Sequence, residues 1–170
     1  MIETERLRLL PLTYEQLLLY IRMDPALEHE LQLSETTRSI SADLQEAFDQ
    51  TILPNVADKS KNYLFHTLWT VILKSENRMV GDLCLVGEPN DKGEVEIGYG
   101  TYEDFRGKGY MSEAVGGMIG WLKTQPRVLS VNAATEKINV ASFTVLKKNN
   151  FKKLGESETL FLWRLDFQPA

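Results

Sequence analysis

The chain is poor in the residues that build disulfides and metal centres: its 170 residues include one cysteine and two histidines. A single cysteine excludes a disulfide within the chain and a cysteine-rich metal site. Cys84 stands in the apolar segment VGDLCLVG, and we interpret it as a small buried hydrophobic residue rather than a nucleophile. His29 and His66 are far apart, and neither has a partner at metal-ligand spacing. We therefore expect no metal site.

Long apolar runs are lacking as well. No hydrophobic stretch approaches 18 residues, and the opening segment MIETERLRLL carries acidic residues where a secretory signal would be apolar. The formal net charge of -5 argues against nonspecific binding to nucleic acid or anionic lipid. We interpret the basic cluster Lys147, Lys148, Lys152 and Lys153 as a solvated face. These features predict a cytoplasmic protein that binds neither membranes nor nucleic acid.

The order of apolar patterns predicts one α+β domain over residues 1–170, built on one mixed sheet. An alternating strand ends at Pro11, and Thr13 and Gln16 cap a helix over 14–23. A second helix runs from about Ser41 and ends at Pro54. The remaining elements are strands at 63–74, 79–87 and 94–102 in an antiparallel meander, a helix at 109–124, a strand at 128–135, a helix at 139–149, and strands at 151–158 and 159–167.

Glycine is also scarce, yet five of the 11 glycines fall within FRGKGYMSEAVGGMIGWL, residues 105–122. Gly107 and Gly109 stand between a strand and a helix, where glycines let successive backbone N–H groups point into one hollow. The helix start adds unpaired N–H groups and a positive dipole end, so a phosphate is stabilised there. Arg106, Lys108 and Ser112 add charge and a hydroxyl donor. The triphosphate-binding G-x-x-x-x-G-K-[ST] pattern and the dinucleotide fingerprint are both absent.

Three segments of the sequence resemble one known family. EVEIGYGTYEDFRGKGYMSEA resembles the acetyl-CoA-binding core of the GNAT N-acetyltransferases. TERLRLLPLT resembles the opening strand of the branch that acetylates ribosomal-protein N-termini (RimJ/RimL-type), and NVASFTVLKKNNF resembles the N-x-x-S segment of that branch. Three separated segments in the right order are far more specific than one glycine pair, and the resemblance extends over nearly the whole chain.

This resemblance implies the GNAT acyl-CoA N-acyltransferase fold, with a mixed, mostly antiparallel sheet of about seven strands flanked by about four helices. It implies an N-acetyltransferase that uses acetyl-CoA as cosubstrate without a metal, as a monomer or homodimer. The residues that it assigns to acetyl-CoA are Tyr99, Gly100, Thr101, Arg106, Gly107, Lys108, Gly109, Tyr110, Met111, Ser112 and Asn139.

The sequence departs from the family pattern at two positions. The pattern Q/R-x-x-G-x-G/A begins here with Asp104, a lost donor for which Arg106 is the candidate replacement. The family's Gly-Phe is here Asn150-Phe151, and asparagine is the next best residue after glycine at a left-handed helix end.

The resemblance also suggests a reason for the glycines inside the helix, which cost about 0.5–1 kcal/mol each relative to alanine. In the family this helix packs closely on the sheet. Gly116 and Gly120 are four residues apart on one face, so we expect the close approach there and expect Gly120→Leu to be strongly destabilising. Gly98 and Gly100 suggest a bulge where their strand splays from its neighbour and exposes an edge to the pantetheine arm.

Amide formation from a thioester needs a neutral amine, donors for the oxyanion and help for the leaving thiolate. Glu96 is the candidate base, acting through water or by holding the cationic amine, and Glu94 on the same face is the alternative. Backbone N–H groups around residues 99–101 are the candidate oxyanion and pantetheine partners.

The proton donor to the thiolate departs from the common family pattern. A tyrosine usually stands seven residues after the asparagine, where this chain has Leu146. In the ribosomal-protein branch a serine three residues after the asparagine is the proposed substitute, which is Ser142 here. A hydrogen-bonding role for Ser142 without proton transfer remains open, as does unassisted departure of the thiolate.

The acceptor is not readable from the sequence. We expect its site among the helices before residue 60 and the 54–63 loop, where Glu28, Glu30, Glu35 and Asp58 suit a cationic amine. A peptide N-terminus, a polyamine, an aminoglycoside and a small metabolite all remain open. Two other functions also remain: a noncatalytic acyl-CoA-binding module, suggested by Leu146, and a phosphate binder unrelated to CoA.

Overall fold

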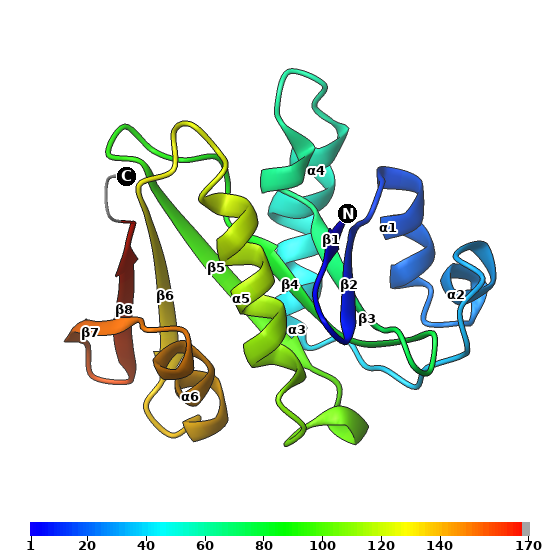
Figure 1. Ribbon diagram of the computed structural model, residues 1–170. Helices are drawn as coiled ribbons and strands as arrows, with labels where there is room; N and C mark the ends of the chain where they lie inside the picture. The colour runs from blue at the N-terminus through cyan, green and yellow to red at the C-terminus, as the bar shows by residue number, and fades with distance from the viewer. Residues whose placement is uncertain (168–170) are drawn as a thin grey trace.

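The computed structural model describes residues 1–167, which are arranged around one mixed sheet of eight strands (Figure 1). The strand order is β1-β2-β3-β4-β5-β6-β8-β7, and every neighbouring pair is antiparallel except β5 and β6. The strands are β1 (Ile2–Glu3), β2 (Leu7–Pro11), β3 (Leu68–Leu73), β4 (Arg78–Leu85), β5 (Glu94–Thr101), β6 (Ser130–Glu136), β7 (Lys152–Glu156) and β8 (Leu160–Asp166). The α+β class and the β3-β4-β5 meander are confirmed.

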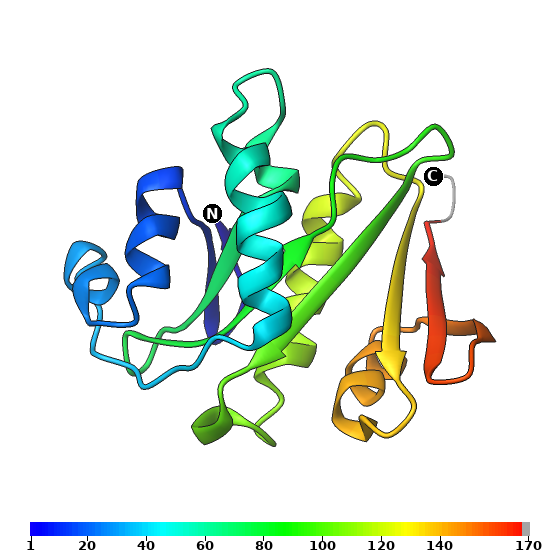
Figure 2. The same cartoon turned by 180° about the vertical axis from the view of Figure 1, so that it is seen from behind.

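The helices lie on both faces of this sheet (Figures 1 and 2). They are α1 (Tyr14–Ile21), α2 (Ala26–Glu30), α3 (Ala42–Ala47), α4 (Leu53–Ala57), α5 (Tyr110–Leu122) and α6 (Val140–Lys148). A π-helical turn, Phe48–Ile52, joins α3 and α4 into one rod, and two 3-10 turns cover Tyr63–Phe65 and Glu103–Phe105. None of the helices in the described part of the chain is long and apolar enough to cross a membrane.

Local sequence signals place several boundaries. The predicted capping box forms at α1, where the Thr13 hydroxyl accepts from the Gln16 N–H and the Gln16 side chain accepts from the Thr13 N–H. Ser41 caps α3 by accepting from the Leu44 N–H. Asn150 has a φ of 67°, which confirms the left-handed helix end after α6.

The predicted end of the second helix at Pro54 is wrong, because the helical rod continues to Ala57. Pro54 stands in the first turn of α4, directly after the π-helical turn. There the backbone hydrogen-bond ladder is already shifted, and the N–H that proline lacks is not required.

Three further elements differ from the sequence-based expectation of about seven strands and four helices. The two-residue β1 and the five-residue α2 are too short to show a hydrophobic period. The strand predicted from residue 63 begins at Leu68, because Tyr63–Phe65 form a 3-10 turn capped by Asn62. Its aromatic residues suggested a strand, but Phe65 instead packs on Trp121 of α5, with ring centres 5.4 Å apart.

The sheet separates two hydrophobic cores. One lies under α5, whose Ala114, Val115 and Met118 are fully buried against the β2–β6 strands. The other lies between the opposite face and the α1–α4 segment, around Tyr20 and Phe48. Helices therefore shield both faces of β4 and β5, and the strands that carry the site have a fixed position.

The parallel pair β5–β6 separates partway along its length. Registered pairing ends at Glu96 and Asn132, while β5 continues to Thr101 and β6 to Glu136. Figure 1 shows the two strands diverging toward α6. The predicted splay is confirmed, but the predicted bulge at Gly98 and Gly100 is wrong, because β4 and β5 pair in continuous register from Gly81–Thr101 to Leu85–Ile97.

The close approach of α5 to its neighbours occurs at a different glycine from the one predicted. A Cβ added at Gly117 would lie 2.8 Å from Thr4 Cγ2, and one at Gly116 would lie 3.1 Å from Asn149 Oδ1. Gly120 is exposed, and among residues 1–167 no heavy atom lies within 4 Å of an added Cβ. The prediction for Gly120 is therefore wrong, because the helix rotates that position toward solvent.

Candidate functional site

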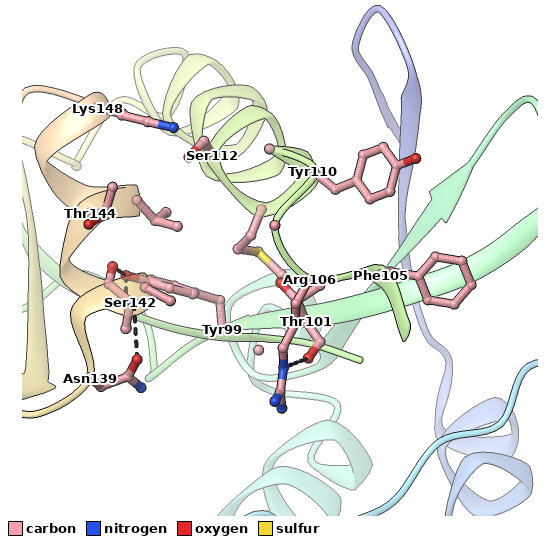
Figure 3. Close-up of a pocket in the computed structure, with 16 residues that line it drawn as sticks. Tyr99, Thr101, Phe105, Arg106, Tyr110, Ser112, Asn139, Ser142, Thr144 and Lys148 are labelled. Atoms are coloured by element: carbon pink, nitrogen blue, oxygen red, sulfur yellow. Dashed lines mark hydrogen bonds between the residues drawn. The ribbon is translucent and has the colours of Figure 1, made fainter. Parts of the chain in front are cut away.

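A cavity of about 490 Å³ opens where β5 leaves β6, between the N-terminal turn of α5 and helix α6 (Figure 3). Its wall contains Ser142 and ten of the eleven residues predicted to hold acetyl-CoA. These ten are Tyr99, Gly100, Thr101, Arg106, Gly107, Gly109, Tyr110, Met111, Ser112 and Asn139. The exception is Lys108, whose ammonium lies 5.7 Å from the centre of the Phe105 ring. The fold thus gathers residues from three separate segments around one space.

The turn before α5 has the geometry of an anion-binding site. Gly107 and Gly109 have φ angles of 77° and 79°, a left-handed conformation that glycine adopts without steric cost. Gly109 is the N-cap of the 13-residue α5, and no side chain in the described part of the chain caps it. The first N–H groups of the helix remain available at its positive end. This cradle fits a phosphate group such as those of CoA.

Arg6 supports this turn. Its Nη1 donates to the Lys108 carbonyl at 3.1 Å, and its guanidinium lies 4.8 Å from the centre of the Tyr110 ring. Its Nε donates to Glu113 Oε1 at 2.9 Å, while the Thr4 hydroxyl donates to Glu113 Oε2 at 2.5 Å. Glu113 is thereby held toward the N-terminal segment instead of competing for the anion site. The sequence reasoning missed Arg6, because no local motif links residues 107 positions apart.

Tyr99 and Ser142 form a hydrogen-bonded pair in the cavity wall. The Tyr99 hydroxyl donates to the Ser142 carbonyl at 2.7 Å, and the Ser142 hydroxyl lies 3.3 Å from the Tyr99 oxygen as a donor. Burial raises the pKa of Tyr99 to about 12, so the phenol stays protonated and its proton is engaged by the carbonyl. Asn139 Oδ1 accepts from the Ser142 N–H at 3.1 Å and caps α6. Ser142 is consequently fixed at the start of this helix.

The two carboxylates proposed as bases lie away from the cavity. Glu96 is exposed on β5. Within residues 1–167, neither Glu94 nor Glu96 lines this cavity or the second cavity described below. Hydrogen bonds from Asn90 at 2.9 Å and Arg164 at 2.8 Å hold the pKa of Glu94 below its usual value. This makes Glu94 a weaker base and favours Glu96 between the two.

Residues that sequence reasoning missed complete the wall: Phe105, Ala141, Thr144, Val145 and Lys148. Lys148 belongs to the cluster interpreted as a solvated face, but its side chain extends from α6 toward the N-terminal turn of α5 (Figure 3). Its position in the last turn of the predicted helix was visible in the sequence, but the direction of its side chain depends on how α6 packs. Lys148 therefore brings a positive charge toward the start of α5. The guanidinium of Arg106 points away from Lys148, and its Nε donates to the Thr101 carbonyl at 3.2 Å (Figure 3).

A second cavity, of about 730 Å³, lies on the opposite face of β5, next to the segment before α3 and the first residues of α3. It shares Tyr99, Gly100, Thr101 and Arg106 with the first cavity. The acceptor site was expected among the helices before residue 60 and the 54–63 loop. Within residues 1–167, the start of α3 lines this cavity and the 54–63 loop does not. Asp104 lines this second cavity rather than the first. Cys84 also lines it, half-buried, and burial raises the pKa of its thiol to about 11.

The four carboxylates expected to attract the acceptor, Glu28, Glu30, Glu35 and Asp58, all lie outside the wall of this cavity as residues 1–167 define it. Glu28 is buried and pairs with Arg38 at 2.6 Å. Within the same range no group of three or more histidine, cysteine or carboxylate side chains is arranged to hold a metal ion.

Comparisons with known proteins agree with this geometry. Residues 6–152 match the family model described as the acetyltransferase (GNAT) domain. The uncharacterized N-acetyltransferase YjdG of Bacillus subtilis (strain 168) is 32% identical over 83 residues, which are 49% of this chain and 49% of that protein. The matched segment therefore spans about half the length of this curated relative.

Solved structures share the fold over almost the whole chain. Ribosomal-protein-S5-alanine acetyltransferase from Vibrio fischeri superimposes with a TM-score of 0.70 and 21% identity, over 96% of this chain and 94% of that one. RimL, a ribosomal L7/L12 alpha-N-protein acetyltransferase solved with coenzyme A, superimposes with a TM-score of 0.65 and 16% identity, over 96% and 95%. The resemblance noted in the sequence is confirmed at the level of family and fold.

Proposed function

The chain belongs to the GNAT acetyltransferase family, and on this basis we propose that it transfers an acetyl group from acetyl-CoA to a primary amine by direct attack in a ternary complex. The observation that carries this proposal is the pair of cavities on opposite faces of β5, which share the backbone of residues 99–101. Two substrates can occupy the two cavities at once and meet at that backbone.

In this proposal the turn at Gly107 and Gly109, with Lys148, binds the phosphates of acetyl-CoA, which supplies the reactive thioester. The edge of β5 beyond Glu96 has no registered pairing with β6 and is available to the pantetheine arm. The N–H groups of Tyr99 and Thr101 point to that edge, because the next N–H along the strand, that of Tyr102, donates to the Val80 carbonyl on the β4 side. We assign these two N–H groups to the oxyanion.

Ser142 assists the departing sulfur by donating its hydroxyl hydrogen bond. Its present hydrogen bond to Tyr99 is long, at 3.3 Å, so a small rotation of the hydroxyl releases it. Tyr99 positions Ser142, because its protonated hydroxyl donates a hydrogen bond to the Ser142 carbonyl. Glu96 is exposed, and its role is to accept the proton of the amine through water.

The first test is calorimetry with acetyl-CoA, CoA and ATP. We expect acetyl-CoA to bind with a micromolar dissociation constant, about -8 kcal/mol, and ATP not to bind. Binding of ATP without acetyl-CoA would instead support a phosphate binder unrelated to CoA.

The second test follows thiol release from acetyl-CoA with a panel of primary amines. Release that depends on an amine supports the proposal, and Ser142→Ala and Glu96→Gln should each slow it. Glu94→Gln is the matched control, since it removes a charge from the same face of β5 but at a residue committed to Arg164. Binding of acetyl-CoA without release for any amine supports the noncatalytic module, for which the fully buried Leu146 in place of a tyrosine is the reason.

A further inference from the structure

The second cavity contains a carboxylate that neither the family pattern nor the proposed mechanism uses. Asp82 lies on β4 directly opposite Gly100 of β5, is 8% exposed, and lines this cavity but not the first. A buried carboxylate is costly unless its charge is compensated, so its position in a cavity wall calls for an explanation.

Two tyrosines hold Asp82 in place. The Tyr20 hydroxyl donates to Asp82 Oδ2 at 2.6 Å, and the Tyr102 hydroxyl donates to Oδ1 and Oδ2 at 3.0 and 3.1 Å. Both tyrosines are buried, Tyr20 completely. These donors are neutral, so they orient the carboxylate without cancelling its charge, and lone pairs of its oxygens remain to accept a further donor.

The nearby cation does not neutralise Asp82. Arg38 also lines the cavity, but its Nη1 donates to the buried Glu28 at 2.6 Å and its Nη2 donates to the Tyr20 carbonyl at 3.1 Å. Glu28, Arg38 and ionised Asp82 together carry one excess negative charge. The other charged side chains of the wall are Asp43, Glu103 and Asp104 against Arg106. The cavity is therefore negative and complementary to a cation.

The floor of the cavity is kept open by missing side chains. Gly98 and Gly100 are two residues apart on β5 and share a face. A Cβ added at Gly98 would make only ordinary van der Waals contact with Cys84 Sγ, at 3.6 Å. Among residues 1–167, no heavy atom lies within 4 Å of a Cβ added at Gly100. Because β5 has no bulge at these glycines, they are not required for an unusual backbone conformation, and their effect is to leave space in the cavity.

We propose that Asp82, oriented by Tyr20 and Tyr102, binds the ammonium group of the acceptor in this cavity, and that the acceptor is a cationic primary amine. This inference rests on the proposed function. The shared chemistry is the ammonium group, which either a small diamine or the free N-terminus of a peptide supplies.

The test measures binding of two probes, 1,4-diaminobutane and a tetrapeptide with a free N-terminal alanine. Their uncharged counterparts are 1,4-butanediol and the N-acetylated peptide. We expect at least one amine probe, but neither counterpart, to bind the wild-type protein. Asp82→Asn should weaken that binding at least tenfold, because a hydrogen bond to a charged group is lost. Gly98→Val should weaken it as well, by filling the floor without touching Asp82.

Glu15→Gln is the matched control, since it removes the same charge from an exposed position on α1. It should bind the amine like the wild type, and all three variants should bind acetyl-CoA like the wild type. The proposal is overturned if neither amine probe binds, or if Asp82→Asn binds the probe as the wild type does. Gly98→Val keeps the test decisive should Asp82→Asn fail to fold.

The same proteins separate this inference from the proposed function. Thiol release from acetyl-CoA with an amine, at equal rates in wild type and Asp82→Asn, supports the transfer reaction and rejects the role of Asp82. Asp82-dependent amine binding without thiol release supports the inference and rejects the transfer reaction.

Discussion

Two alanine substitutions in α5 should have different effects on stability. Gly120 is exposed, with open space around an added Cβ among residues 1–167, so Gly120→Ala should stabilise the protein by about 0.5–1 kcal/mol through helix propensity alone. Gly117→Ala gains the same propensity but places its Cβ 2.8 Å from Thr4 Cγ2. Overpacking of this kind costs about 1–3 kcal/mol, so Gly117→Ala should be neutral to destabilising.

Thr4 cannot withdraw freely from the new methyl group. Its hydroxyl donates to Glu113 and its N–H donates to the Leu7 carbonyl at 2.9 Å. We therefore expect the two single variants to differ by about 1–3 kcal/mol in the free energy of unfolding. At about 2–4 °C per kcal/mol for a chain of this size, the melting temperatures should differ by several degrees.

Thermal and urea unfolding, followed by circular dichroism, measure this difference. Thr4→Ser removes the contacted methyl group and keeps the hydroxyl, so the double variant Gly117→Ala/Thr4→Ser should recover the stability that Gly117→Ala lost. The interaction energy from this double-mutant cycle isolates the contact. The reasoning is refuted if Gly117→Ala stabilises as much as Gly120→Ala, or if the cycle gives no interaction energy.

Three further predictions concern the two cavities. Burial raises the pKa of Asp82 from 3.8 to about 6, although both tyrosines oppose the rise. The protonated carboxyl therefore stabilises the fold at low pH, and this contribution is lost as the pH rises through 6. The stability of the wild type relative to Asp82→Asn, measured by urea unfolding, should fall by about 2 kcal/mol between pH 4 and 7, and a constant difference would contradict the assigned burial. Tyr99→Phe should lower kcat for thiol release about five- to tenfold, as expected for one neutral hydrogen bond, and adding Ser142→Ala should cost little more if the pair acts as a unit. Gly107→Ala should weaken acetyl-CoA binding about tenfold because φ is 77°, whereas Gly87→Ala, with φ of 86° on a turn outside the cavity, should strain the backbone similarly yet bind normally; equal affinities would contradict the anion-binding role of the turn.

Elements with a clear local signal were predictable from the sequence. The capping residues Thr13 and Ser41 satisfy N–H groups of their own helices, and the meander strands carry their period over many residues. The same signal was absent for β1 and α2, which are stabilised by their neighbours rather than by a pattern of their own. Pro54 shows the reverse case, since a strong local signal was overridden by a π-helical turn.

The candidate site divides in the same way. The glycine turn was predictable because it depends on backbone conformation and short spacing, which a sequence displays directly, whereas Asn139 and Ser142 were assigned through the resemblance to the family. Lys148 and Arg6 were missed because the direction of a long side chain depends on how its element packs. The positions of Glu96 and Glu94 outside both cavities also depend on packing. Alternation along a strand predicts which face of the sheet a side chain occupies, but not which elements pack against that face.

The sequence by itself determined the strand-turn-helix unit at residues 94–122, the order of the longer elements and the family, since all of these are written in local periods and motifs. Only the tertiary structure decided which of the five clustered glycines lies against a neighbouring segment, where β5 parts from β6, and that Asp82, Tyr20 and Tyr102 meet beside a cavity. Asp82 is 62 positions from Tyr20 and 20 positions from Tyr102 in the chain. Contacts of that range arise from the packing of two cores against one sheet, and no local pattern encodes them.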